Sequence, residues 1–263
     1  GLNNKTSGLR KGEIVCFTAG SGQGKSQVCR EIGHNLIING EKVAYIALEE
    51  NVQRSIRGLV SIGLSKPIHL PDVRKEIPEK DMKEAWNSIK DNCFFYDHWG
   101  SIDSANLLNR IKYLVRACGC QWIILDHLSI VISGQENSDE RRLIDNTMTK
   151  LRSLVEELNI GVLLVSHLRR LDGNRDHTDG ATTSLAHLRG SAAIAQLSDI
   201  VIGLERNQQS QNNADRVTVR VLKNRFSGDT GVATYLHYNK DTGRLIEEGY
   251  TSQGEPNDGQ NIY

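Results

Sequence analysis

The chain alternates short apolar runs with longer stretches in which apolar residues recur at helical spacing. The short runs are rich in β-branched residues and end at polar or glycine-rich positions, which is typical of strands. The first five predicted strands are residues 14–17, 43–48, 93–96, 122–125 and 161–165. The predicted helices are residues 26–38, residues 101–117 with Ser101 as N-cap, and residues 139–158.

Alternation of strands and helices predicts a parallel sheet covered by helices on both faces. After Asp199 the pattern changes to strands without intervening helices, at residues 200–204, 217–222 and 232–238. Turn sequences at residues 228–231 and 241–243 punctuate this part of the chain. We therefore predict an α/β fold with a mainly parallel central sheet flanked by helices and antiparallel C-terminal strands.

Composition narrows the class of protein. The 263 residues carry 32 Lys and Arg against 32 Asp and Glu, and 38% of them are hydrophobic. This balance excludes a disordered chain and argues against a protein that coats nucleic acid through bulk positive charge. No apolar run is long enough to span a bilayer, so no membrane partner is expected. The five cysteines are an odd number without zinc-site spacing, which favours reduced, packed thiols and a cytosolic compartment.

The strongest chemical signal follows the first predicted strand. The segment Ala19-Gly-Ser-Gly-Gln-Gly-Lys-Ser26 matches the phosphate-loop pattern, with alanine where glycine is the commoner first residue. Backbone N–H groups of such a loop surround the phosphates, while Lys25 reaches the β- and γ-phosphates and Ser26 ligates Mg²⁺. The expected nucleotide-binding residues here are Gly20, Ser21, Gly22, Gln23, Gly24, Lys25 and Ser26. A chance glycine-rich turn is the alternative, and Gly-Lys-Ser in register after an apolar strand argues against it.

Two carboxylates follow other predicted strands. Asp126 closes the strand at 122–125, where it would hold Mg²⁺ partly through water. The next residue is His127, so the water-activating glutamate that many motor ATPases place there has to come from elsewhere. Glu49 ends the strand at 43–48 and can orient water for attack on the γ-phosphate. The alternative is that Glu49 and Glu50 form an acidic pair that starts a helix.

His167 follows the strand at 161–165. At that position its ring can hydrogen-bond to the γ-phosphate and respond to its loss. The alternative is a structural histidine, and the position at a strand's carboxyl end favours the sensor.

The order of the motifs resembles a known family. After the phosphate loop they are Leu48-Glu-Glu50, Ile123-Ile-Leu-Asp-His127, Ser138-Asp-Glu-Arg141, Ser166-His-Leu168, Leu188-Arg-Gly-Ser191, Gln196-Leu-Ser-Asp199, Leu204-Glu-Arg-Asn207 and Lys223-Asn-Arg-Phe-Ser-Gly-Asp-Thr-Gly231. They resemble the helicase domain of the T-odd phage primase-helicases, which is related to DnaB and to the mitochondrial Twinkle helicase. The resemblance extends over residues 6–250. It implies a RecA-like P-loop ATPase core in a ring, usually a hexamer, that uses ATP or dTTP with Mg²⁺ to translocate on single-stranded DNA and unwind the replication fork.

The resemblance assigns roles to matching residues. Glu49 matches the catalytic base, Asp126 the metal-binding acid and His167 the γ-phosphate sensor. Arg225 matches an arginine finger that acts on the nucleotide of the neighbouring subunit; the alternative is an ordinary exposed arginine beside a turn. Further matches are Arg206 and Tyr238, on either side of the nucleotide base, and Gln196, which links nucleotide state to the DNA loops. Without the resemblance, Tyr238 reads equally well as an ordinary strand aromatic.

The DNA-contacting loops are expected after the strands that carry Asp126 and His167. Arg170 and Arg175 lie in a polar stretch, residues 170–186, and Arg169 immediately precedes it. Arginine and backbone N–H groups there can grip successive phosphates without reading sequence. Residues 133–139 are polar and not basic, so contacts there would come from the backbone and from Ser133 and Asn137. The alternative is a solvated basic loop.

The expected domain boundaries are residues 1–248 for the ATPase domain and 249–263 for a flexible tail. A primase segment and the family's subunit-linking helix would lie before Gly1, so we expect a piece of a larger polypeptide with weakened ring assembly. The partners implied are single-stranded or forked DNA, neighbouring subunits, a polymerase and a fused or separate primase. The implied compartment is the host cytoplasm for a phage protein, or the mitochondrial matrix for a eukaryotic relative.

Two other classes share the phosphate loop. One is a recombinase-like or clock-type ATPase that scaffolds without unwinding, and only the motifs after residue 188 argue against it. The other is a small-molecule kinase, which needs an arginine-bearing lid over a second substrate. No segment of the sequence has that character.

Overall fold

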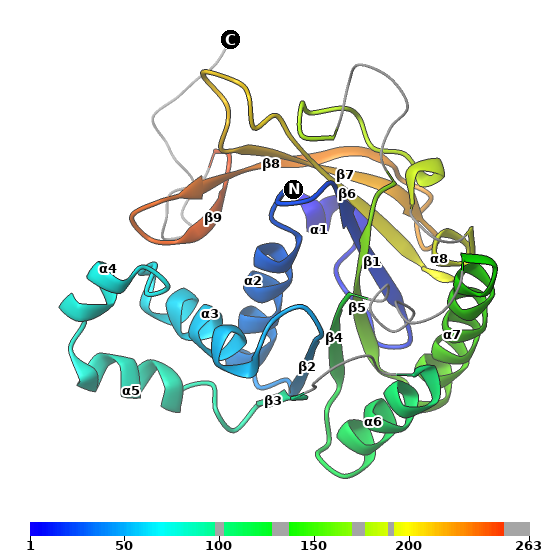
Figure 1. The fold of residues 1–263 in the computed structure, drawn as a ribbon, viewed down its shortest axis with the longest axis horizontal. Coiled ribbons are helices and arrows are strands. Elements are labelled where there is room, and N and C mark those ends of the chain that lie inside the picture. Colours follow the sequence, from blue (N-terminus) through cyan, green and yellow to red (C-terminus); the bar gives the residue numbers. More distant parts are fainter. Residues whose placement is uncertain (98–102, 128–136, 170–176, 189–191, 250–263) are drawn as a thin grey trace.

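The computed structural model describes residues 1–97, 103–127, 137–169, 177–188 and 192–249, with the side chains of 137–140 left out (Figure 1). These residues form a nine-stranded sheet in the order β3-β2-β4-β5-β1-β6-β7-β8-β9. The strands are β1 (Ile14–Ala19), β2 (Val43–Ala47), β3 (Cys93–Phe95), β4 (Trp122–Asp126), β5 (Gly161–His167), β6 (Ile200–Arg206), β7 (Arg216–Asn224), β8 (Gly231–Asn239) and β9 (Arg244–Glu247). The helices are α1 (Leu2–Thr6), α2 (Lys25–Ile38), α3 (Val52–Leu64), α4 (Pro71–Glu76), α5 (Glu79–Asn87), α6 (Ser104–Arg116), α7 (Asn137–Leu158), α8 (Ala192–Leu197) and the 3₁₀ turn η2 (Leu185–His187).

The sheet is parallel from β3 to β6 and antiparallel from β6 to β9. The predicted mixed sheet is therefore confirmed. β1 is the central strand of the sheet and pairs with β5 on one side and with β6 on the other. The C-terminal strands extend this sheet on the β6 side.

Helices bury both faces of the sheet (Figure 1). On one face α6 and α7 pack apolar side chains, such as Ile111 and Leu151, against alternate residues of β1 and β4. On the other face α2 and α3 pack Val28 and Leu59 against the remaining strand residues. Two-sided burial accounts for the continuous apolar character of β5, whose first six residues are all buried.

Several element boundaries differ from the predictions. The N-cap of α6 is Asp103, whose side chain accepts a hydrogen bond from the N–H of Asn106 at 2.9 Å, so the predicted cap at Ser101 is wrong. Ser101 itself lies outside the described residues. The strands β4 and β5 extend one and two residues beyond their apolar runs and end at Asp126 and His167, the polar residues predicted to close them. The edge strand β9, with the sequence Arg-Leu-Ile-Glu, and the helices α1, α3 to α5 and α8 were not predicted.

The cysteines are packed as predicted. All five are described and none forms a disulfide; four are buried and Cys118 is partly exposed. Burial raises the pKa of the Cys16 thiol in β1 to about 12. Among the described residues, no helix has the length and apolar character needed to cross a membrane.

Helix α2 lies very close to the sheet at Gly33. A Cβ atom there would collide with the Tyr45 hydroxyl and come within 2.7 Å of the Ile124 Cδ1 atom. In α3, a Cβ atom at Gly63 would meet nothing nearer than the His34 Nε2 atom at 3.3 Å. The two glycines therefore differ in the space around them although both are helical.

Gly33→Ala is expected to lower the free energy of unfolding by about 1–3 kcal/mol, because overpacking outweighs the better helix propensity of alanine. Gly63→Ala is the matched control and is expected to change stability by less than about 1 kcal/mol. Urea unfolding of both variants measures the difference. Equal stabilities would show that α2 does not pack this closely on β2 and β4.

Candidate active site

The site lies at one edge of the sheet, where the parallel strands end. The register pairs Ala47 with Asp126 and Ala19 with His167, so residues that end or follow β1, β2, β4 and β5 meet there. They surround a cavity of about 390 Å³, the phosphate cleft. Its walls include residues 21–27, Glu49, Asp126 and His167.

The phosphate loop joins β1 to α2. Gly22 and Gly24 have φ values of 68° and 93°, in the left-handed region that glycine adopts without strain. Helix α2 begins at Lys25, so its amino end points at the loop. The Lys25 ammonium lies inside the loop and donates hydrogen bonds to the carbonyls of Ala19 at 3.1 Å and Gly20 at 2.8 Å.

Charges in the cleft offset one another. Burial lowers the pKa of Lys25, while the nearby carboxylates of Asp126 and Glu49 act in the opposite direction. Burial also raises the pKa of Asp126, against the opposing effect of its hydrogen bond from Ser26. The cleft therefore contains the Lys25 cation and the Asp126 anion, and desolvation destabilises the charged form of each.

Ser26 and Asp126, the two residues predicted to bind the metal ion, are hydrogen-bonded to each other. The Ser26 hydroxyl donates to Oδ2 of Asp126 at 2.5 Å. A hydroxyl and a half-buried carboxylate beside a phosphate loop are oxygen ligands of the kind that Mg²⁺ prefers, so the residues fit this ion. The structure brings both side chains together from positions 100 residues apart.

Glu49 lies against two histidines. Its Oε1 atom is 2.6 Å from Nε2 of His127 and 3.8 Å from Nε2 of His167. The two imidazole rings meet edge to face with centroids 4.2 Å apart. The contact with His127 was missed from the sequence, which marked this residue only as a position without glutamate. The sequence could have indicated this contact through position alone. His127 directly follows β4, and Glu49 lies two residues after the adjacent parallel strand β2.

Glu50 has a different role from Glu49. Its carboxylate pairs with Arg30 of α2 at 2.5 Å and accepts from the Ser55 hydroxyl at 2.7 Å. Helix α3 begins at Val52 and is capped by Asn51, whose side chain accepts from the backbone N–H of Arg54. Because neither glutamate lies in the first turn of α3, the helix-initiating alternative does not describe this pair.

Arg206 and Tyr238 end or nearly end β6 and β8 at the same edge of the sheet. Arg206 pairs with Val217 of β7. Val217 in turn pairs with Leu236 of β8, two residues before Tyr238. Side chains alternate along a strand, so Arg206 and Tyr238 project from the same face, two strands apart. Burial, and then the charge of Glu31, raise the pKa of Tyr238.

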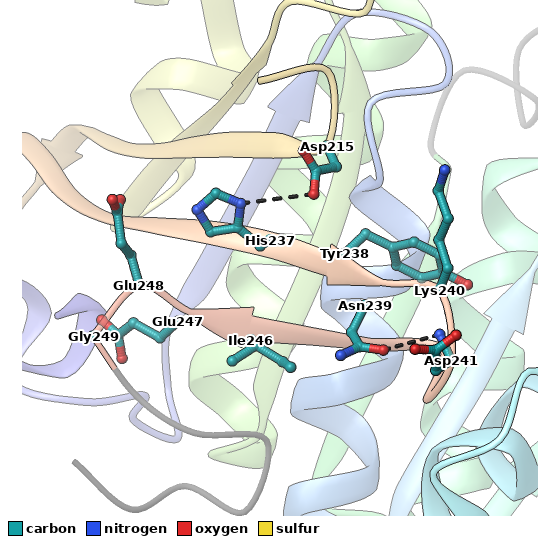
Figure 2. A pocket seen from close by; sticks show the side chains of 10 residues that line it. All are labelled: Asp215, His237, Tyr238, Asn239, Lys240, Asp241, Ile246, Glu247, Glu248 and Gly249. Atoms are coloured by element: carbon teal, nitrogen blue, oxygen red, sulfur yellow. Dashed lines mark hydrogen bonds and ion pairs between the residues drawn. The ribbon is translucent and has the colours of Figure 1, made fainter. Parts of the chain in front are cut away.

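Neither side chain lines the phosphate cleft among the residues that the structure describes. The Arg206 guanidinium donates to the carbonyl of Ala214. Tyr238 borders a separate hollow of about 590 Å³ along β8 and β9, where Asp215 pairs with His237 (Figure 2). A position beside the base remains a prediction for both residues.

Arg225 lies at the opposite edge of the sheet. It follows Asn224, which pairs with Ile200 at the start of β6, whereas Ala19 at the phosphate loop pairs with Leu204. Its half-exposed guanidinium donates to Oδ1 of Asp199 at 3.0 Å and to the carbonyl of Gln196 at 2.8 Å. The structure therefore does not bring Arg225 to the phosphate cleft of its own chain.

The remaining predicted residues concern DNA and coupling. Arg169 is exposed after β5, and its backbone N–H donates to the carbonyl of His187 at 2.8 Å. Gln196 is exposed in α8, next to Arg225. Asn137 is the first residue of α7. Ser133, Arg170 and Arg175 lie outside the described residues.

The half-buried Asp126 carboxylate gives a test by pH. Because its pKa is raised in the folded protein, its ionised form destabilises the nucleotide-free fold at high pH, and this cost disappears once the group is protonated in both states. Asp126→Asn is expected to raise the Tm at about pH 7, with the gain shrinking as the pH falls toward about 4. Melting curves in EDTA measure this shift.

Glu50→Gln is the matched control for Asp126→Asn. It makes the same chemical change but removes the partner of Arg30, so its Tm is expected to fall. A lower Tm for Asp126→Asn at neutral pH would contradict a destabilising desolvation of the Asp126 anion.

Known proteins share both the sequence and the fold. The family model for the DnaB-like helicase C-terminal domain matches residues 1–247. The DNA helicase/primase of Enterobacteria phage T3 is 39% identical over 270 residues, covering 98% of this chain and 47% of that protein. The replicative helicase DnaB of Geobacillus stearothermophilus is 25% identical over 91% of this chain and 54% of that protein. The chain thus spans about half the length of these relatives.

Two solved structures confirm the predicted fold. The ATPase domain of G40P has a TM-score of 0.77 at 21% identity, covering 93% of this chain and 88% of that one. A DnaB-like replicative helicase, described with its interactions with primase, has a TM-score of 0.78 at 20% identity, covering 93% and 61%. The match of the family model over nearly the whole chain places this protein in the family of DnaB-like helicase C-terminal domains.

Proposed function

We propose that this chain is the motor domain of a replicative DNA helicase. Hydrolysis of the nucleotide's β–γ phosphoanhydride in a ring, usually a hexamer, drives translocation on single-stranded DNA and unwinding of the duplex at the fork. The main support for the proposal is the arrangement of the site. The phosphate loop, Asp126 and Glu49 share one cleft, while Arg225 lies at the far edge of the sheet. A site divided in this way needs a second subunit to complete it. Membership of the DnaB-like family supports the same function.

The residues of the cleft divide the chemistry. Loop N–H groups and Lys25 bind the β- and γ-phosphates, and Ser26 and Asp126 would hold Mg²⁺, which neutralises charge on the phosphate oxygens. Glu49 orients a water molecule and accepts its proton as the water attacks the γ-phosphorus in line with the leaving β-phosphate oxygen. His167 contacts the γ-phosphate and responds to its release. Arg225 of the neighbouring subunit stabilises the charge that develops in the transition state.

The proposal extends to DNA and coupling. Arg169, with Arg170 and Arg175, and the loop bearing Ser133 and Asn137 would face the bore of the ring and grip phosphates without reading bases. Gln196 would link nucleotide state to these loops, and its carbonyl already accepts a hydrogen bond from Arg225. Arg206 and Tyr238 would flank the base.

Finer points belong to the same proposal. The nucleotide is ATP or dTTP, and residues 1–248 form the ATPase domain. The predicted tail, residues 249–263, lies outside the described residues from residue 250 on. A primase, fused or separate, and a polymerase are proposed partners, since one relative is a DNA helicase/primase. The proposed place of action is the cytoplasm of the host cell of a phage.

Unwinding of a forked duplex tests the function. The protein assembled into rings is expected to displace a labelled strand with Mg²⁺ and nucleotide, and single-stranded DNA is expected to stimulate hydrolysis. Lys25→Ala is expected to lower hydrolysis at least about 100-fold, because the transferred phosphoryl loses its charge compensation. Stimulated hydrolysis without strand displacement in well-formed rings would instead indicate a scaffolding ATPase.

Mixing two inactive variants tests the divided site. Lys25→Ala and Arg225→Ala rings are each expected to be nearly inactive. Random mixing before assembly pairs an intact loop with an intact arginine at about a quarter of the interfaces, so activity is expected to recover to that order. Lys25→Ala mixed with Glu49→Gln is the matched control and stays inactive, because both residues belong to one cleft. Failure of the first mixture to recover would contradict the action of Arg225 between subunits.

A further inference from the structure

We propose that His127 is a positioning residue, whose Nε2–H group holds the Glu49 carboxylate in the orientation from which it accepts the proton of the attacking water. This inference rests on the proposed hydrolytic function and assigns a role to a residue outside the phosphate-binding machinery. His127 follows Asp126, at the position where the sequence offered no glutamate.

Glu49 needs such a partner. Its side chain is 50% exposed, and an exposed glutamate samples several rotamers unless a contact restricts them. The Nε2 atom of His127 is 2.6 Å from Oε1 of Glu49, within hydrogen-bond distance. His167 is 3.8 Å from the same oxygen, too far for a direct hydrogen bond. His127 is therefore the nearer of the two rings that restrain the carboxylate.

His127 is itself held firmly. It is buried, and its ring packs edge to face against that of His167. The backbone N–H of Leu48 donates to the carbonyl of Asp126 at 2.6 Å, which joins the ends of β2 and β4 immediately before Glu49 and His127. The backbone thus fixes the two residues side by side. The separation of the pair therefore follows from the register of β2 against β4, whose ends these residues closely follow.

The chemistry of the contact assigns the proton. An ionised carboxylate only accepts hydrogen bonds, so the Nε2 atom of His127 is the donor. Its Nδ1 atom is buried and has no hydrogen-bond partner among the described residues. The contact occupies one oxygen of Glu49 and leaves Oε2 for water. A carboxylate restrained through one oxygen and open at the other suits a general base.

Three substitutions test the role of His127. In glutamine, the Nε2 donor lies the same number of bonds from Cα as in histidine, whereas the asparagine donor lies one bond closer. His127→Ala and His127→Asn are expected to lower kcat about 10- to 100-fold, with nucleotide Kd changed less than about 3-fold. His127→Gln is expected to restore kcat to within about 5-fold of the wild type. His69→Ala, at an exposed position away from the cleft, controls for the loss of a histidine.

A double variant separates positioning from a structural role. In a Glu49→Gln background, His127→Ala is expected to cause no further loss of kcat, because the group that it positions is already removed. Equal losses in both backgrounds would overturn the proposal, as would wild-type kcat in His127→Ala. Melting curves identify unfolded variants, and His127→Gln keeps the test decisive if His127→Ala does not fold.

The assay also distinguishes two other outcomes. The wild-type protein is measured in parallel, and its failure to hydrolyse nucleotide would refute the proposed function itself. Excess Mg²⁺ is combined with a chelator selective for transition metals, since ligand atoms of Glu49, His127 and His167 lie within 4.8 Å of one another. Loss of wild-type activity on adding the chelator would overturn positioning by a hydrogen bond in favour of a bound transition ion.

Discussion

Parallel pairing of the strands from β3 to β6 is the constraint on which the site depends. Because these strands run in one direction, their carboxyl ends meet at a single edge, and the residues that end or follow them are brought together. Ser26 and Asp126 are 100 residues apart in the chain yet share a hydrogen bond for this reason. The same edge carries Glu49, His127 and His167, which supply the polar contacts opposite the phosphate loop.

The antiparallel strands reverse this arrangement and place Arg225 away from the cleft of its own chain. β7 runs against β6, so the residue after its carboxyl end, Arg225, lies at the amino edge of the parallel strands. There Asp199 holds its guanidinium and also accepts from the backbone of Ile14 at 2.9 Å and from Arg152 at 2.5 Å. One buried carboxylate thus fixes the start of β1, helix α7 and the arginine on the surface that a neighbouring subunit would meet. The width of the sheet therefore separates the phosphate cleft from Arg225.

Sequence patterns predicted the features that local chemistry dictates. β-Branched runs marked the strands, and the glycines before Lys25 marked the phosphate loop because few other residues adopt those backbone angles. The helices α3 to α5 were missed since no separate apolar period was recognised in residues 52–87, and β9 because four residues carry little pattern. The N-cap of α6 was wrongly predicted at Ser101, because Ser101 and Asp103 both have good capping side chains and lie close to the same helix start. The structure has Asp103 as the N-cap.

The partners of individual side chains could not be predicted from local patterns. The contact of His127 with Glu49 depends on the register of β2 against β4, and the hold of Asp199 on Arg225 depends on how β7 meets β6. The separation of Glu50 from Glu49 likewise arises from Arg30 and Ser55, on α2 and α3. These contacts follow from tertiary packing, which a single sequence encodes only through the whole fold.

A cryo-electron microscopy map of the rings with ADP–aluminium fluoride, Mg²⁺ and single-stranded DNA would show whether Arg225 completes the cleft of the neighbouring subunit. The account predicts that each occupied cleft contains the Lys25 and Glu49 of one subunit and the Arg225 of its neighbour within hydrogen-bond distance of the fluoride group. An occupied cleft in which the arginine of the same chain reaches the fluoride group, or in which Arg225 of every subunit stays on Asp199 away from the nucleotide, would contradict it.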